Sequence, residues 1–141
     1  MSRHGVSEHS IFLATTGTLA IAAGLAIYAL LRPTRIALIP ATLFFPPSRH
    51  IPSLLGSLPS LLHAFAIPLL TMACVRAVRR AHVMTICLVW ALIDVLFELG
   101  QRYPTRFLPS GTFDPLDVLG VLAGASLAAA LASTFARREK A

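Results

Sequence analysis

The chain has 141 residues, of which 56% are hydrophobic and only 13% are charged. Soluble domains carry about 25% charged residues, so this composition excludes an ordinary cytosolic enzyme, a disordered tail and a nucleic-acid-binding domain. The net charge is +6, but the basic residues fall between apolar runs, as they do in membrane proteins. A transmembrane helix needs about 20 apolar residues, which leaves room for about four spans and no separate soluble domain.

Four apolar runs predict an all-α, four-helix transmembrane bundle that forms a single membrane domain over residues 1–141. The predicted helices cover about 11–31, 54–75, 83–100 and 115–136. The first run is longer than the core of a signal peptide and is therefore predicted to be a retained helix. The second contains Pro59 and Pro68, which membrane helices tolerate when neighbouring groups satisfy the freed carbonyls.

A fifth apolar stretch, 36–45, is too short to cross a bilayer as a helix. Pro40 lies within it, and Pro46 and Pro47 follow it directly. The stretch is therefore predicted to be an interfacial or re-entrant segment between the first and second helices.

The basic residues predict the orientation of the bundle. Four spans place both termini and the turn at 76–80 on one side, with seven of the 12 Lys and Arg; the other five are spread over two longer loops. Three of the seven lie within the short turn itself. Because the density of basic residues near helix ends sets orientation, both termini are predicted to be cytoplasmic.

Polar side chains interrupt the apolar runs at a few positions only. The second run contains His63, and the third contains Asp94 and Glu98. Inserting a charged side chain at the centre of a membrane helix costs about 2.5–3.5 kcal/mol of free energy, so such residues usually have a function. With the predicted orientation, all three fall in the outer third of the membrane, as do Asp114 and Asp117 at the start of the last helix. The sequence therefore predicts an outward-facing polar pocket.

The spacing in the third helix places Asp94, Glu98 and Gln101 on one face. Two carboxylates one turn apart in a low-dielectric setting do not readily ionise together unless a cation intervenes. This arrangement suits a proton acceptor, a cation site or a hydrogen-bonding pocket for a polar headgroup. The alternative is that Asp94 pairs with His63 or Arg102 and only holds helices together.

The acids at the start of the last helix have a second interpretation. An Asp at the N-cap, a Pro at the first helical position and an acid two residues later are favoured at helix starts, so capping alone explains Asp114. Asp117 is a weaker cap and a better pocket candidate, while His63 by itself is compatible with a satisfied core histidine. The full predicted pocket comprises His63, Asp94, Glu98, Gln101, Asp114 and Asp117, with Arg102 and Arg106 at its rim.

Small residues predict where helices touch. One stripe contains Gly120, Gly124 and Ala128, and another contains Thr16, Ala20 and Gly24. Such stripes allow close backbone approach in lipid, so they could pack the first helix on the last or dock another protein; the alternative is a plain alanine-rich helix. The two cysteines lack Cys-x-x-Cys spacing and predict neither a disulfide framework nor a zinc site.

Three segments, at 58–65, 97–101 and 111–120, together resemble the VanZ-like family of small bacterial membrane proteins. Residues 97–101 (FELGQ) match an E-x-x-Q that ends one helix, and residues 111–120 (GTFDPLDVLG), with Gly124, match paired acids that open a glycine-spaced last helix. Residues 58–65 (LPSLLHAF) are similar to a segment with a histidine at the start of an earlier helix. The resemblance implies a multi-pass protein of the bacterial cytoplasmic membrane, and some relatives are linked to teicoplanin resistance. The matching residues are His63, Glu98, Gln101, Asp114 and Asp117.

Three functions are compatible with these features. The favoured one is a membrane protein whose pocket binds an envelope lipid, a glycopeptide-related ligand or a cation. The second is an accessory subunit of a larger membrane complex, with other membrane-protein subunits as its partners. The third, an enzyme using Asp94 and Glu98 as general acid and base, is least favoured because the sequence has no P-loop, Gly-x-Ser-x-Gly or His-Glu-x-x-His motif. The sequence does not identify a cofactor, and it contains no motif with metal-ligand spacing.

Overall fold

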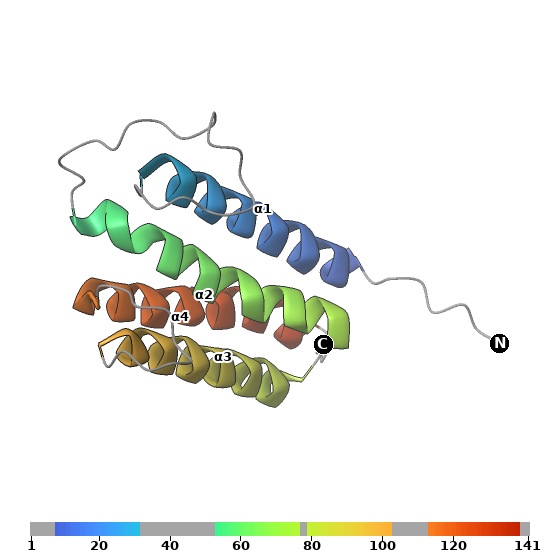
Figure 1. The fold of residues 1–141 in the computed structure, drawn as a ribbon. Helices are drawn as coiled ribbons and strands as arrows, with labels where there is room; N and C mark the ends of the chain where they lie inside the picture. The colour runs from blue at the N-terminus through green and yellow to red at the C-terminus, as the bar shows by residue number, and fades with distance from the viewer. Residues whose placement is uncertain (1–7, 32–52, 77–78, 103–112, 139–141) are drawn as a thin grey trace.

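The computed structural model describes residues 8–31, 53–76, 79–102 and 113–138, and all regular structure in these ranges is helical. The helices are α1 (Glu8–Leu31), α2 (Ser53–Val75), α3 (Arg80–Gln101) and α4 (Pro115–Arg138) (Figure 1). The prediction of an all-α chain with four long helices is confirmed, with ends that differ from the predicted ones by at most three residues. The predicted interfacial or re-entrant segment lies outside the described residues.

Each of the four helices is long and apolar enough to cross a membrane. Large apolar side chains cover their outer surfaces, among them Leu19, Leu88, Leu92 and Leu127. Such broad apolar exposure is unfavourable in water but matches the surface that a lipid bilayer surrounds. The chain is therefore a multi-pass membrane protein.

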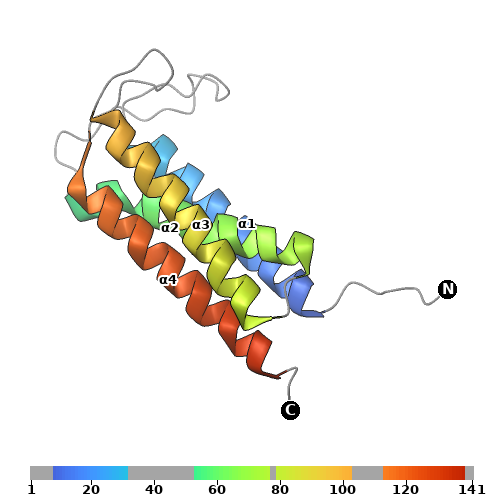
Figure 2. The same ribbon diagram turned by 90° about the horizontal axis from the view of Figure 1, so that it is seen from below.

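The central helix of the bundle is α2. It packs on α1 on one side and on α4 on the other, while α3 packs mainly on α4 and less on α2. Figure 1 shows α1 and α3 on opposite sides of α2, and Figure 2 shows α3 and α4 running side by side. We call the end of the bundle at which α2 connects to α3 the turn end; α1 begins and α4 ends there. The opposite end, where α1 and α3 end, is named the far end.

The glycines of α4 bring its backbone against that of α2. A Cβ atom at Gly124 would collide with the carbonyl oxygen of Leu61 and lie 3.0 Å from the Phe65 nitrogen. A Cβ at Gly120 would lie 3.0 Å from the Ser57 carbonyl oxygen, and Ala128 further along the same stripe is fully buried. The stripe thus allows the close approach that glycine spacing gives membrane helices.

The small residues of α1 also face α2. A Cβ at Gly17 would lie 2.8 Å from the Leu70 side chain, and one at Gly24 would lie 3.4 Å from the Leu62 Cβ. Ala20 is buried between these glycines, whereas Thr16 is only half-buried. Both small-residue stripes therefore pack on α2, so the first stripe does not serve to pack the first helix on the last.

The apolar core occupies the half of the bundle near the turn end. It contains Leu69 and Met72 of α2, Val83 and Cys87 of α3, and the later alanines of α4. At the turn end itself, the Phe135 ring lies 5.0 Å from the His9 ring and 5.2 Å from the Phe12 ring, centre to centre. The buried acids lie in the other half, toward the far end.

Candidate functional site

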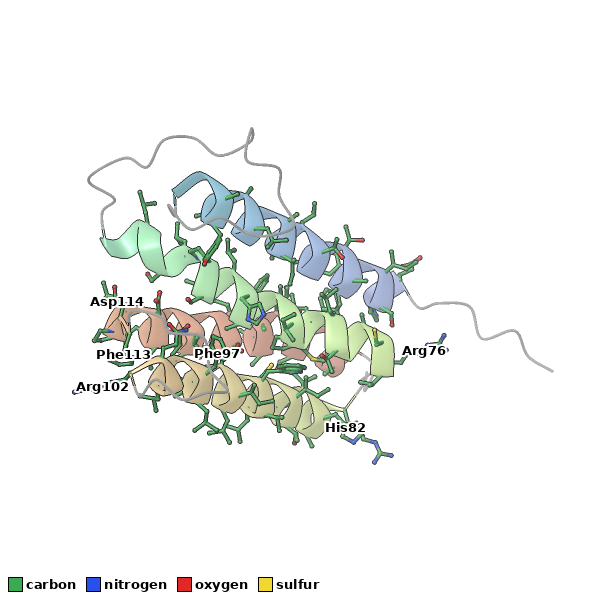
Figure 3. The ribbon with its side chains drawn as sticks, viewed as in Figure 1. Arg76, His82, Phe97, Arg102, Phe113 and Asp114 are labelled. Atoms are coloured by element: carbon green, nitrogen blue, oxygen red, sulfur yellow. The ribbon has the colours of Figure 1, made fainter. Side chains whose placement is uncertain are left out.

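The most distinctive polar contact of the bundle joins α2 to α3. The Nδ1 atom of His63 lies 3.6 Å from the Oδ2 atom of Asp94. Asp94 is 9% exposed, whereas the His63 side chain is 53% exposed. His63 and Arg102 were the two predicted partners of Asp94, and the structure places His63 beside it. The guanidinium of Arg102 lies instead over the Phe113 ring, 5.8 Å from its centre, at the far end (Figure 3).

A groove of about 600 Å³ surrounds this pair. Its polar lining comes from Tyr28 of α1, from Ser60 and His63 of α2 and from Asp94 and Glu98 of α3. Its apolar lining comes mainly from α1 and α3, with Pro59 of α2 and Val121 of α4. The volume is within the range of about 300–1,000 Å³ that is typical of small-molecule sites, and an apolar lining with a few convergent polar groups is their usual composition.

Helical periodicity explains why these side chains share one groove. On α3, Trp90, Asp94 and Glu98 are spaced by four residues and so lie on one face. On α1, Ile21, Leu25 and Tyr28 are spaced by four and three residues, which also places them on one face. The groove is therefore walled lengthwise by α1 and α3, and α2 supplies its histidine between them.

The groove opens on the side of the bundle. Its rims are Leu25 on α1 and Ile93 and Phe97 on α3, and each of these side chains is about half exposed. These rim residues lie within segments that are long and apolar enough to span a membrane.

The other predicted pocket residues that the structure describes do not line this groove. Gln101 is half-buried at the end of α3. Asp114 caps α4, since its Oδ1 accepts the backbone N–H of Leu116 at 2.9 Å. Asp117 is buried in the first turn of α4, one turn before Val121. Arg102 is exposed at the end of α3, and Arg106 lies outside the described residues.

Three lining residues with a polar group, Tyr28, Ser60 and Trp90, were not predicted as site residues from the sequence. Trp90 carried a usable signal, because a tryptophan in mid-span needs a partner for its indole N–H. In the structure this Nε1–H donates to the Thr71 hydroxyl at 3.0 Å, and that hydroxyl donates to the Ile67 carbonyl at 2.9 Å. Tyr28 and Ser60 carried no such signal, since single hydroxyls are ordinary in apolar runs.

The chemistry of the groove is that of carboxylate acceptors beside an imidazole. Ionised carboxylates only accept hydrogen bonds, whereas an imidazole can donate or accept. Within the described ranges, no three His, Cys, Asp or Glu side chains are grouped so that they could hold a metal ion. The groove is thus equipped to hold hydrogen-bond donors against Asp94 and Glu98.

Comparisons of the chain with protein-family models, with curated proteins and with solved structures give no match.

Proposed function

We propose that this chain is a VanZ-like integral membrane protein of the bacterial cytoplasmic membrane that binds the polar part of an envelope lipid in the groove between α1 and α3. Both termini lie on the cytoplasmic side in this proposal, which puts the far end toward the outside. The observation that carries it is the His63–Asp94 pair in a groove whose apolar rims are half exposed, with Glu98 one turn further toward the far end.

The cost of burying polar groups supports a binding role. Asp94 and Glu98 lie in a membrane-spanning helix, and each is 9% exposed. Ionisable residues at such positions are costly to insert, and they commonly mark substrate or ion sites. Two of the residues that carry the VanZ-like resemblance, His63 and Glu98, line the same groove although they come from different helices.

Lipid retention tests the proposal. The protein is purified in a mild detergent, and native mass spectrometry counts the lipids that remain bound. We expect the wild type to retain a lipid and the double variant Asp94→Asn with Glu98→Gln to lose most of it. Asp114→Asn is the matched control, since this acid caps α4 outside the groove and Asn is an equally good cap.

Three outcomes would contradict the proposal. Equal lipid retention by wild type and double variant would show that the buried acids hold no headgroup. Retention of a metal ion or of added glycopeptide, in place of lipid, would assign the groove to one of the rival ligands. Purification with a partner in fixed stoichiometry would favour an accessory subunit. The structure offers that alternative little support, because the glycines of both stripes already contact α2.

A further inference from the structure

We infer, on the basis of the lipid-binding proposal, that the groove is loaded sideways from the surrounding leaflet. The inferred ligand is a lipid whose head presents hydrogen-bond donors, amine or hydroxyl groups, to Asp94 and Glu98. Its head lies toward the far end of the bundle and its chain lies against Trp90.

The groove is polar at one end and apolar at the other. Glu98 and Tyr28 each lie three residues before the ends of their helices, or about 4.5 Å from the far end at 1.5 Å per residue. Trp90 on α3 and Ile21 on α1 line the other end of the groove, closer to the middle of their helices. A lipid of the leaflet at the far end has the same gradient, with its head near the membrane surface and its chain toward the bilayer centre.

The polar lining selects for hydrogen-bond donors. Among the residues that the structure describes, the charged or chargeable side chains that line the groove are Asp94, Glu98 and His63, and no described Lys or Arg lines it. Carboxylates accept hydrogen bonds and repel anions, so an amine or hydroxyl head matches them and a phosphate head placed there does not. The exposed rim residues Leu25, Ile93 and Phe97 give such a lipid an apolar passage from the side.

The only tryptophan of the chain reports directly on the occupant. Trp90 lines the apolar end of the groove, and bromine on an acyl chain quenches indole fluorescence on contact. The protein is reconstituted in phosphatidylcholine nanodiscs and titrated with amphiphiles that share one brominated chain and carry an amine, a hydroxyl or a phosphate head. We expect saturable quenching, with the amine or hydroxyl amphiphile binding at least about tenfold more tightly than the phosphate one, a difference of about 1.4 kcal/mol.

Two variants separate the head from the chain. Glu98→Gln should reduce the preference for the amine head, whereas Asp114→Asn should leave it unchanged. Gly24→Leu should weaken quenching by all three amphiphiles, because it adds a side chain to the groove wall where a Cβ meets only ordinary contacts. Gly56→Leu, at a position with nothing within 4 Å of its Cβ, is the control.

Comparison of the amine and hydroxyl amphiphiles shows which of the two groups donates the hydrogen bond, and tighter binding of either one supports the inference. Quenching that rises linearly with bromolipid content and is equal for all heads and variants would show only contact with bulk lipid and would overturn it. If native mass spectrometry finds acid-dependent lipid retention but a phosphate head quenches best, the inference fails and the proposed function stands. If no lipid is retained, the proposed function fails as well.

Discussion

His63 and Asp94 face each other from α2 and α3, with Nδ1 and Oδ2 3.6 Å apart, in a part of the bundle that the apolar core does not reach. One turn closer to the turn end along α3, Trp90 donates its indole N–H to Thr71 of α2. These two polar contacts join helices that pack against each other less extensively than α2 packs on α1 or α4. The histidine is thereby held at the edge of the groove with its ring half exposed.

The coupling between His63 and Asp94 is measurable with a double-mutant cycle. We expect His63→Ala and Asp94→Ala to be non-additive in the free energy of unfolding, by about 0.6 kcal/mol and at most about 1.7 kcal/mol, the range for interhelical polar contacts in membranes. Unfolding by sodium dodecyl sulfate in mixed micelles gives the four free energies. Strict additivity would mean that the two side chains do not interact.

The Trp90–Thr71 hydrogen bond should stabilise the α2–α3 contact. Replacing Thr71 with Val keeps the shape but removes the acceptor at 3.0 Å, so the free energy of unfolding should fall by about 1 kcal/mol and Trp90 emission should shift to the blue. Thr134→Val is the control, because that exposed hydroxyl bonds only to the Leu131 carbonyl of its own helix. Equal effects of the two substitutions would contradict the role of the interhelical bond.

Close packing of α4 on α2 predicts opposite effects for two glycine substitutions. Gly124→Ala places a Cβ against the Leu61 carbonyl oxygen and should destabilise the protein by about 1–3 kcal/mol through overpacking. Gly56→Ala meets nothing within 4 Å and should be neutral or stabilise by up to about 1 kcal/mol, since alanine is the better helix former. Thermal unfolding in detergent measures both, and a stable Gly124→Ala variant would contradict the contact.

Cys74 offers a test of orientation. It is exposed near the end of α2 at the turn end, whereas Cys87, the other cysteine of the chain, is buried. If the turn end is cytoplasmic, a membrane-impermeant maleimide should label the protein in inverted vesicles and not in right-side-out ones. Cys74→Ser should abolish the labelling in both, and labelling from the outside would reverse the proposed topology.

The positions of the helices could be predicted from the sequence, but which helices pack against each other could not. Apolar runs of about 20 residues bounded by charges or prolines determine which segments span the bilayer. Stripes such as Gly120–Gly124 indicate that something approaches closely, yet they do not identify it. Both stripes pack on α2. The α2 atoms that face the glycines belong mainly to the backbone and to large side chains such as Leu61 and Leu70.

The site was predictable only in part for a related reason. Buried charges are costly in a membrane, so Asp94, Glu98 and His63 are conspicuous in the sequence, and the structure brings these three into one groove. Asp114 and Gln101 are also polar residues close to the apolar runs, but they lie outside the groove. Asp114 caps α4, and Gln101 is the last residue of α3. The apolar walls follow from how α1 and α3 flank α2, which no local pattern encodes.

The most direct test of the binding groove is to locate a brominated lipid within the protein. Crystals grown from a lipidic mesophase containing the brominated amine amphiphile would show its chain by the anomalous scattering of bromine. We expect a bromine peak between α1 and α3 beside Trp90, with the head close to Asp94 and Glu98. Bromine peaks confined to the outer surface of the bundle, with α1 closed against α3, would contradict it.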